Sequence, residues 1–244
     1  MKPFLLLATR AENVAADGEY EAFLDAGRLV PDELHRMRLE AGPLPAIDLD
    51  DYSGVIVGGS PFNASDPDDV KSNIQRRVEG DFARLLQEVV ERDFPFFGAC
   101  YGIGLLGTHQ GGVVDRTFSE PIGAVRVTLT AEGEADPVFG TVEPSFHAFV
   151  GHKEACSVLP DGAVLLASGA TCPVQAFRIG QNVYATQFHP ELTVPGIITR
   201  IRVYRDYGYF DPAEMDALIA MAESSSVPEP GRLIAAFTAR HARP

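Results

Sequence analysis

The chain has 244 residues, of which 45% are hydrophobic and 22% charged, and its formal net charge is −14. This composition is typical of a globular protein with enough length for one α/β domain, or one domain with an appendage. The negative charge is spread along the chain and disfavours nucleic acid as a partner.

The first apolar stretch, residues 5–8, is short and is soon followed by Arg10. A secretory signal has a longer apolar core, so we expect a buried strand here. No segment approaches the ~20 apolar residues of a membrane-spanning helix, so no membrane association is expected.

Three widely spaced cysteines, Cys100, Cys156 and Cys172, disfavour a disulfide framework and predict a reduced, cytoplasmic protein. Neither a CxxC nor an HExxH motif occurs, so neither a metal nor a cofactor is expected.

Strands and helices alternate in the first half of the predicted fold. Strands are expected at residues 3–8, 52–57 and 94–98, and at 34–39, where a helix is the alternative. Helices are expected at residues 17–29, with Asp17 as N-cap, and at 70–92, where Ile74, Val78, Phe82, Leu85, Leu86 and Val89 follow helical spacing. This alternation predicts an α/β fold with a mostly parallel, open, flavodoxin-like sheet flanked by helices.

The pattern changes from Ile122 onward. Closely spaced strands are expected at residues 125–129, 146–150, 164–167, 174–179 and 183–188. Helices follow after Val194, and Pro212, Pro228 and Pro230 mark helix starts.

Cys100 is the candidate nucleophile. It follows a predicted buried strand and lies between Gly98 and Gly102, where small residues permit a tight turn from strand to helix. Such a turn raises the side chain at the carboxyl edge of the sheet, and the start of a helix favours the thiolate. Taken alone, the position also fits a buried structural cysteine.

His189 is the candidate base, since it ends a predicted strand and is followed by Pro190 and Glu191. Pro190 favours extended geometry at His189, and residues two apart in an extended segment project to the same side. Glu191 can therefore fix the imidazole tautomer while the other ring nitrogen faces the thiol. Taken alone, this tripeptide also fits a surface turn.

The attack of a thiolate on an amide places negative charge on oxygen, which preorganised N–H groups stabilise. Gly58 and Gly59 follow a buried strand and are candidates to position one such N–H, and the N–H of Tyr101 is the second.

Together these motifs resemble the class I, or triad, glutamine amidotransferases. The resemblance covers about residues 1–195 and is carried by segments 58–60, 98–102, 111–113 and 187–191. Within the family, the chain looks most like stand-alone proteins similar to the amidotransferase part of GMP synthase. We therefore expect an amidotransferase domain at residues 1–195 and a C-terminal helical extension at 196–244, packed on the same domain.

The resemblance implies that Cys100 forms a γ-glutamyl thioester from glutamine and releases ammonia, with His189 carrying protons and Glu191 orienting it. It also implies that Gly59 and Tyr101 supply the oxyanion N–H groups. The segment Gly151, His152 and Lys153 would line the glutamine pocket through its backbone.

Gly104 departs from the family, which usually carries a glutamine there that helps to hold the α-amino-acid end of the substrate. This departure keeps a second hypothesis open, a γ-glutamyl peptidase that uses the same triad on γ-glutamyl amides. It also leads us to expect that Gly104→Gln would lower the KM for glutamine.

The partner of such an enzyme is not encoded here. No GxxxxGK[ST] phosphate-binding loop occurs, so any ATP-using synthetase is a separate chain, or the enzyme simply hydrolyses its substrate. A third hypothesis is an inactive binding or regulatory module of the same fold, which the presence of Cys100, His189 and Glu191 disfavours.

Overall fold

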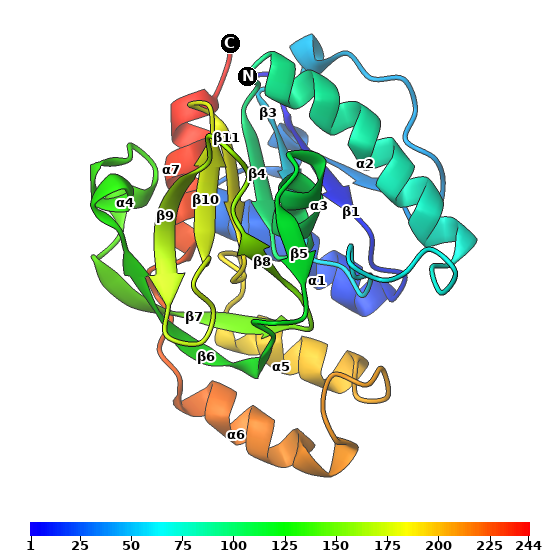
Figure 1. Ribbon diagram of the computed structural model, residues 1–244, viewed down its shortest axis with the longest axis vertical. Coiled ribbons are helices and arrows are strands. Elements are labelled where there is room, and N and C mark those ends of the chain that lie inside the picture. Colours follow the sequence, from blue (N-terminus) through cyan, green and yellow to red (C-terminus); the bar gives the residue numbers. More distant parts are fainter.

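The computed structural model describes residues 1–244, and its centre is a nine-stranded sheet in the order β2-β1-β3-β4-β11-β10-β9-β6-β7 (Figure 1). The strands are β1 Phe4–Ala8, β2 Leu34–Arg38, β3 Gly54–Val57, β4 Phe96–Ala99, β6 Glu120–Leu129, β7 Ser145–His152, β9 Val164–Gly169, β10 Ala176–Ile179 and β11 Val183–Thr186. A separate two-stranded sheet pairs β5 (Val113–Asp115) with β8 (Ala155–Val158).

The sheet is mixed. Strands β2, β1, β3, β4 and β11 are parallel, whereas β10, β9, β6 and β7 continue the sheet with antiparallel pairs. The predicted α/β fold with flanking helices is therefore confirmed, but the parallel part is limited to one half. Short connections join β9 to β10 and β10 to β11, and these suit antiparallel pairing, whereas the connection between β6 and β7 is longer.

Both faces of the parallel half are buried. Along β1, Phe4 and Leu6 belong to one core cluster and Leu5 and Leu7 to the other, as the two-residue period of a strand requires. Helices α1 (Asn13–Gly27) and α7 (Gly231–His241) contribute to the first cluster, and α2 (Asn73–Glu91) and α3 (Tyr101–His109) to the second.

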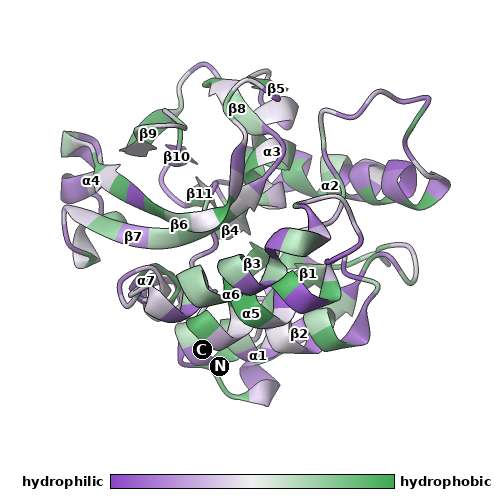
Figure 2. Ribbon diagram, turned by 90° about the horizontal axis from the view of Figure 1, so that it is seen from below, coloured by the Kyte–Doolittle hydropathy of each residue, from purple (hydrophilic) through white to green (hydrophobic).

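Helix α2 follows its predicted pattern closely. Of the six apolar residues at helical spacing, only Ile74, near the start of the helix, is exposed. Figure 2 shows hydrophilic residues over much of α2 and along the loop that leads into it. The buried stripe thus faces the sheet, and the polar side of α2 faces solvent.

The predicted start of α1 was wrong, since the helix begins at Asn13 and Asp17 lies inside it. The buried face of α1 consists of Ala15, Ala16, Glu19 and Phe23. Asp17 points away from this face and forms an ion pair with Arg36 of β2 at 2.9 Å. The start of α1 is therefore set by the packing of the residues before Asp17 and not by the preference of Asp17 for a capping position.

The tail after Val194 forms three helices, as predicted: α5 Val194–Val203, α6 Met215–Ser224 and α7 Gly231–His241. Helix α7 packs beside α1, while α5 and α6 pack with Phe149 of β7 in a third, smaller core cluster. The short helix α4 (Ala131–Ala135) was not predicted. None of the helices combines the length and apolar character needed to cross a membrane.

Candidate active site

Three predicted motifs meet at the carboxyl edge of the parallel strands. Gly58 follows β3, Cys100 follows β4 and the segment ending in His189 follows β11. Strand β4 lies between β3 and β11, so the three chain ends are neighbours in space although they are far apart in sequence. Open α/β sheets bind their ligands at this edge.

Cys100 occupies a turn that few residues other than glycine adopt. Its φ is 52° and its ψ is −91°, and α3 begins at the next residue. Its N–H donates to the carbonyl of Thr186 on β11 at 2.8 Å, which fixes the turn against the sheet. Burial raises the pKa of the Cys100 thiol to about 12, and Arg10 is the strongest of the charges that oppose this rise. A strained turn of this kind is typical of a nucleophile at the top of a strand.

His189 lines the same small cavity as Cys100. Its N–H donates to the carbonyl of Phe149 at 3.0 Å, and its Nδ1 lies 2.9 Å from Oε1 of Glu191. Burial lowers the pKa of His189, so the imidazole stays neutral at pH 7. Burial alone would raise the pKa of Glu191, but His189 and Arg200 outweigh it and hold that pKa well below its usual range.

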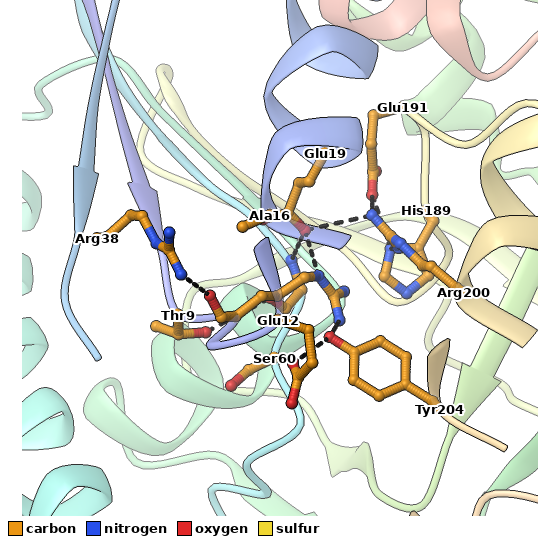
Figure 3. A network of polar contacts seen from close by, with 12 residues as sticks. Thr9, Glu12, Ala16, Glu19, Arg38, Ser60, His189, Glu191, Arg200 and Tyr204 are labelled. Carbon is orange, nitrogen blue, oxygen red and sulfur yellow. Dashed lines mark hydrogen bonds and ion pairs between the residues drawn. The ribbon is translucent and has the colours of Figure 1, made fainter. Parts of the chain in front are cut away.

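Arg200, on α5, contacts both of these residues (Figure 3). Its Nη2 donates to Oε1 of Glu191 at 2.8 Å, and its Nη1 lies 3.0 Å from Nδ1 of His189. One ring nitrogen cannot donate to Glu191 and also accept from Arg200. The carboxylate accepts only, so the proton belongs on Nδ1 and the lone pair on Nε2.

A second buried ion pair joins the network from the other side. Oε1 of Glu19 accepts from Nε of Arg10 at 2.9 Å, from Nη2 of Arg200 at 3.2 Å and from the N–H of Gly59 at 3.2 Å. A Cβ on Gly58 would lie 2.5 Å from the Glu19 carboxylate, so this position requires glycine. The Gly59 N–H, predicted to stabilise an oxyanion, is committed to Glu19 in this structure.

The predicted substrate-binding segment lies beside Cys100. Gly151, His152 and Lys153 line a second cavity that Cys100 and Tyr101 share. The His152 ring is not available to a ligand, because Nδ1 contacts the carbonyl of Glu154 and Nε2 contacts Glu120, each at 2.9 Å. The segment therefore offers its backbone and Lys153.

Gly104 lies under the carboxylate of Glu154. A Cβ at residue 104 would lie 3.0 Å from Oε1 of Glu154 and 3.4 Å from the Cβ of Ala64. Glu154 is itself held by the N–H groups of Ala64 and Ser65, both at 2.7 Å. Glu154 thus fills the space into which a longer side chain at residue 104 would extend.

The residues around the cavities that the sequence analysis missed include Arg10, Glu19, Glu154, Arg200, Tyr204 and Tyr209. Arg10 carried a usable signal, because it lies two residues after the end of a buried strand. Tyr204 and Tyr209 lie in the tail, where no strand end marked them.

Glu120, His152 and Cys172 are residues of types that bind metals, and their potential ligand atoms lie within 4.8 Å of one another. Glu120 accepts from His152 and from Gln175, and the Cys172 thiol donates to the carbonyl of Val174. Each group is paired within the protein, so the cluster is explained as a polar network that holds β6 and β7 to the loop before β10.

The family described as glutamine amidotransferase class-I matches residues 33–195, which is more than half of the chain. The chain belongs to the class I glutamine amidotransferase family. Arg10, Glu19 and Arg200 fall outside the matched residues, whereas Cys100, His189 and Glu191 fall inside them.

Curated relatives of this chain include GMP synthases. The glutamine-hydrolysing GMP synthase of Streptomyces avermitilis is 34% identical over 110 residues, which are 45% of this chain and 21% of that protein. One of the subunits of the glutamine-hydrolysing GMP synthase of Thermoplasma acidophilum is 26% identical over 146 residues, 59% of this chain and 66% of that relative. The matched part of the chain thus spans about a fifth of the first of these relatives.

Solved structures show the same fold over nearly the whole chain. A glutamine amidotransferase from Thermotoga maritima superimposes with a TM-score of 0.78 at 20% identity, covering 99% of this chain and 98% of that one. A glutamine amidotransferase from Methylobacillus flagellatus gives a TM-score of 0.70 at 22% identity, with coverages of 98% and 94%.

Proposed function

We propose that this chain is a glutamine amidohydrolase in which Cys100 is the nucleophile, His189 the base and Glu191 the group that orients it. The single observation that carries the proposal is the shared cavity of Cys100 and His189, with Glu191 bonded to the far nitrogen of the ring. That arrangement leaves Nε2 of His189 as the nitrogen with a free lone pair for the thiol proton.

In the proposed reaction, Nε2 takes the thiol proton and the sulfur bonds to the side-chain amide carbon of glutamine. The π pair of the carbonyl moves onto oxygen, beside the Tyr101 N–H at the start of α3, where the first N–H groups have no partner within the helix. The electron pair on oxygen then re-forms the carbonyl, the C–N bond breaks and the nitrogen takes the proton from His189. Ammonia departs, and a γ-glutamyl thioester remains on Cys100. Water, deprotonated by His189, releases glutamate and restores the thiol.

The cavity that Cys100 and His189 share is narrow in this structure, at about 50 Å³. Ligand sites usually measure roughly 300–1,000 Å³, so glutamine requires the cavity to widen. Tyr209, which lines both cavities beside Cys100, is the side chain whose displacement would join them.

The acceptor of the ammonia is part of the proposal. GMP synthases are among the relatives, and one of these relatives is a single subunit of such a synthase, so we propose that a separate synthetase chain takes the ammonia. All three cysteines are free, which fits a reducing compartment such as the cytoplasm.

We also propose that residues 1–195 form the amidotransferase domain and 196–244 an extension packed on it. Leu233, Ile234 and Phe237 of α7 are fully buried in the same core cluster as β1 and β4, which supports this division over an independent appendage.

A γ-glutamyl peptidase remains the second candidate, favoured by Gly104. Glutamine and a γ-glutamyl dipeptide, assayed side by side for glutamate release, separate the two functions. We expect ammonia and glutamate in equal amounts from glutamine, and a much lower rate with the dipeptide. The opposite preference would replace the first function with the second.

Cys100→Ala tests the nucleophile, with Cys156→Ala as the matched control because Cys156 is a buried thiol outside the cavity. We expect Cys100→Ala to lose at least about 10³-fold in kcat and Cys156→Ala to keep it. Mass spectrometry of wild-type protein quenched during turnover should detect a γ-glutamyl group on Cys100. Full activity in Cys100→Ala would overturn the assignment of the nucleophile. A folded wild-type protein that acts on neither substrate would leave the inactive module as the function.

A further inference from the structure

Arg10 is a buried cation beside the candidate nucleophile. It follows β1 at the carboxyl edge of the sheet, is only 4% exposed, and lines the cavity that Cys100 and His189 share. Its Nε donates to Glu19 at 2.9 Å and its Nη1 donates to the hydroxyl of Tyr204 at 3.0 Å. Its Nη2 makes no hydrogen bond within the protein, so this charged donor is available to a group bound in the cavity.

The free nitrogen of Arg10 lies next to Gly59 and the base. A Cβ built on Gly59 would lie 2.6 Å from Nη2 of Arg10 and 2.6 Å from Cε1 of His189. Nη2 and the imidazole therefore both border the open side of Gly59. The N–H of Gly59 is bonded to Glu19, so the donor that this position presents beside the base is the guanidinium.

A buried guanidinium is well suited to stabilise negative charge. A charged donor forms a stronger hydrogen bond to an oxyanion than a neutral N–H does, and a preorganised donor needs no reorganisation during the reaction. Glu19 and Tyr204 hold Arg10 from two sides, and the guanidinium also lies over the Tyr204 ring at 5.4 Å.

We propose that Arg10 is a further catalytic residue, whose Nη2 donates to the oxygen of the tetrahedral intermediate formed at Cys100. This rests on the amidohydrolase function proposed above. As the sulfur bonds to the amide carbon, the π pair of the carbonyl moves to oxygen and is met by Nη2. When the pair returns and the C–N bond breaks, the guanidinium still carries all its protons. Glu19 and Tyr204 are positioning residues for Arg10.

The same cation also acts on the resting thiol. Burial raises the pKa of Cys100, and Arg10 is the largest charge that lowers it, so removing Arg10 should make the thiol still less acidic. The other charged or titratable groups that bear on Cys100 are Arg200, Glu154, Glu191, His189 and Tyr209. These groups are unchanged in a variant of Arg10.

The test compares Arg10→Gln, Arg10→Lys and the control Arg36→Gln. Arg36, on β2, pairs with Asp17 of α1, the helix that also carries Glu19, and Arg36 lies outside both cavities. Arg36→Gln therefore removes the same charge as Arg10→Gln, but at a site away from the thiol. The readouts are kcat and KM for glutamine, and the rate at which iodoacetamide alkylates Cys100 at pH 8, located by mass spectrometry.

We expect Arg10→Gln to lower kcat by about 10²-fold or more with little change in KM, since an oxyanion donor acts in the transition state. Alkylation should slow by about tenfold, because the thiolate loses the positive charge that most favours it. Arg10→Lys keeps the charge without the planar fork, so it should recover the alkylation rate and only part of kcat. Arg36→Gln should match the wild type in both readouts.

A folded Arg10→Gln protein with the kcat and alkylation rate of Arg36→Gln would overturn the inference. If Arg10→Gln does not fold, a full kcat in Arg10→Lys would overturn it equally. If the wild-type protein does not hydrolyse glutamine, the amidohydrolase function is wrong. If alkylation is nevertheless slower in Arg10→Gln than in the wild type, the role of Arg10 toward the thiolate still holds.

Discussion

At the scale of single residues, Cys100 and His189 could be selected from the sequence because each follows a recognisable strand end, and Glu191 because it lies two residues after His189. Parallel strands bring their carboxyl ends to one edge, so two segments separated by many residues meet without any knowledge of side-chain contacts. Arg200 could not be found this way. It lies on a tail helix, and only the packing of α5 against α1 and Phe149 of β7 brings it to His189.

Gly104 is the residue for which the structure leads us to predict the opposite of the effect expected from the sequence. From the sequence, Gly104→Gln was expected to lower the KM for glutamine. The Glu154 carboxylate lies 3.0 Å from the position of the new Cβ and is held by two backbone N–H groups. A Cβ at residue 104 therefore requires Glu154 to shift by a few tenths of an ångström, and the rest of a glutamine side chain would compete with the carboxylate for the same space.

We predict that Gly104→Gln raises the KM for glutamine by about tenfold, because hydrogen bonds to a buried charged group are lost. Steady-state kinetics measure this. Gly80→Gln is the control, since a Cβ on Gly80, in helix α2, meets no atom within 4 Å. A lower KM in Gly104→Gln than in the wild type would restore the expectation drawn from the sequence.

At the scale of elements, periodicity located the long helices and most strands, but not their exact limits. Helix α2 was predicted from its apolar stripe, and five of the six residues in that stripe are buried. Helix α1 started four residues before the predicted cap, because Ala15 and Ala16 pack although no capping side chain precedes them. Strands β5 and β8 are about as short as β3 and β4, but they lack the continuous apolar run that revealed those two strands.

Helix α7 carries a histidine that should make the fold sensitive to acid. His241 is partly buried against Phe237, with ring centroids 4.8 Å apart, and its Nε2 has no partner. Burial lowers the pKa of His241 to about 4, and Arg240 lowers it further than Asp93 raises it. Between pH 6.5 and 4 the unfolded chain therefore binds a proton at this residue that the folded chain does not.

We predict that the free energy of unfolding decreases as pH falls from 6.5 toward 4, and that His241→Leu makes this decrease less steep. Urea denaturation at several pH values measures both slopes. The slope should not vanish, because the pKa of His189 is also lowered by burial. Equal slopes in the variant and the wild type would show that His241 does not titrate differently in the two states.

At the scale of the whole molecule, the order of strands and helices was enough to predict an α/β sheet with helices on both faces. It was not enough to predict where the sheet turns antiparallel, since the pairing of β9, β6 and β7 depends on contacts between distant residues. The position of α7 was equally hidden. Its apolar residues identify a buried helix but do not say that it packs beside α1.

Phe237 tests whether the tail belongs to the main domain. Its ring lies 5.5 Å from that of Phe97 on β4 and 6.0 Å from that of Phe4 on β1, measured between centroids. We predict that Phe237→Ala lowers the free energy of unfolding by about 3–5 kcal/mol, in a single transition. Phe210→Ala, in the smaller cluster around Phe149, should cost less.

Denaturant unfolding followed by circular dichroism measures both variants. If Phe237→Ala instead produced two transitions, with the activity lost only in the second, the tail would be an independent unit and the proposed single domain would be wrong.

The two ends of the chain are joined, since the N–H of Lys2 donates to the carbonyl of Arg243 at 2.9 Å. The walls around Cys100 likewise come from both ends, Arg10 near the start and Tyr204 and Tyr209 near the finish. A ribosome makes Cys100 long before it makes these tyrosines. A growing chain that has not yet reached Tyr204 therefore carries the thiol without its cover, and the surroundings of Cys100 are complete only once both tyrosines have been made.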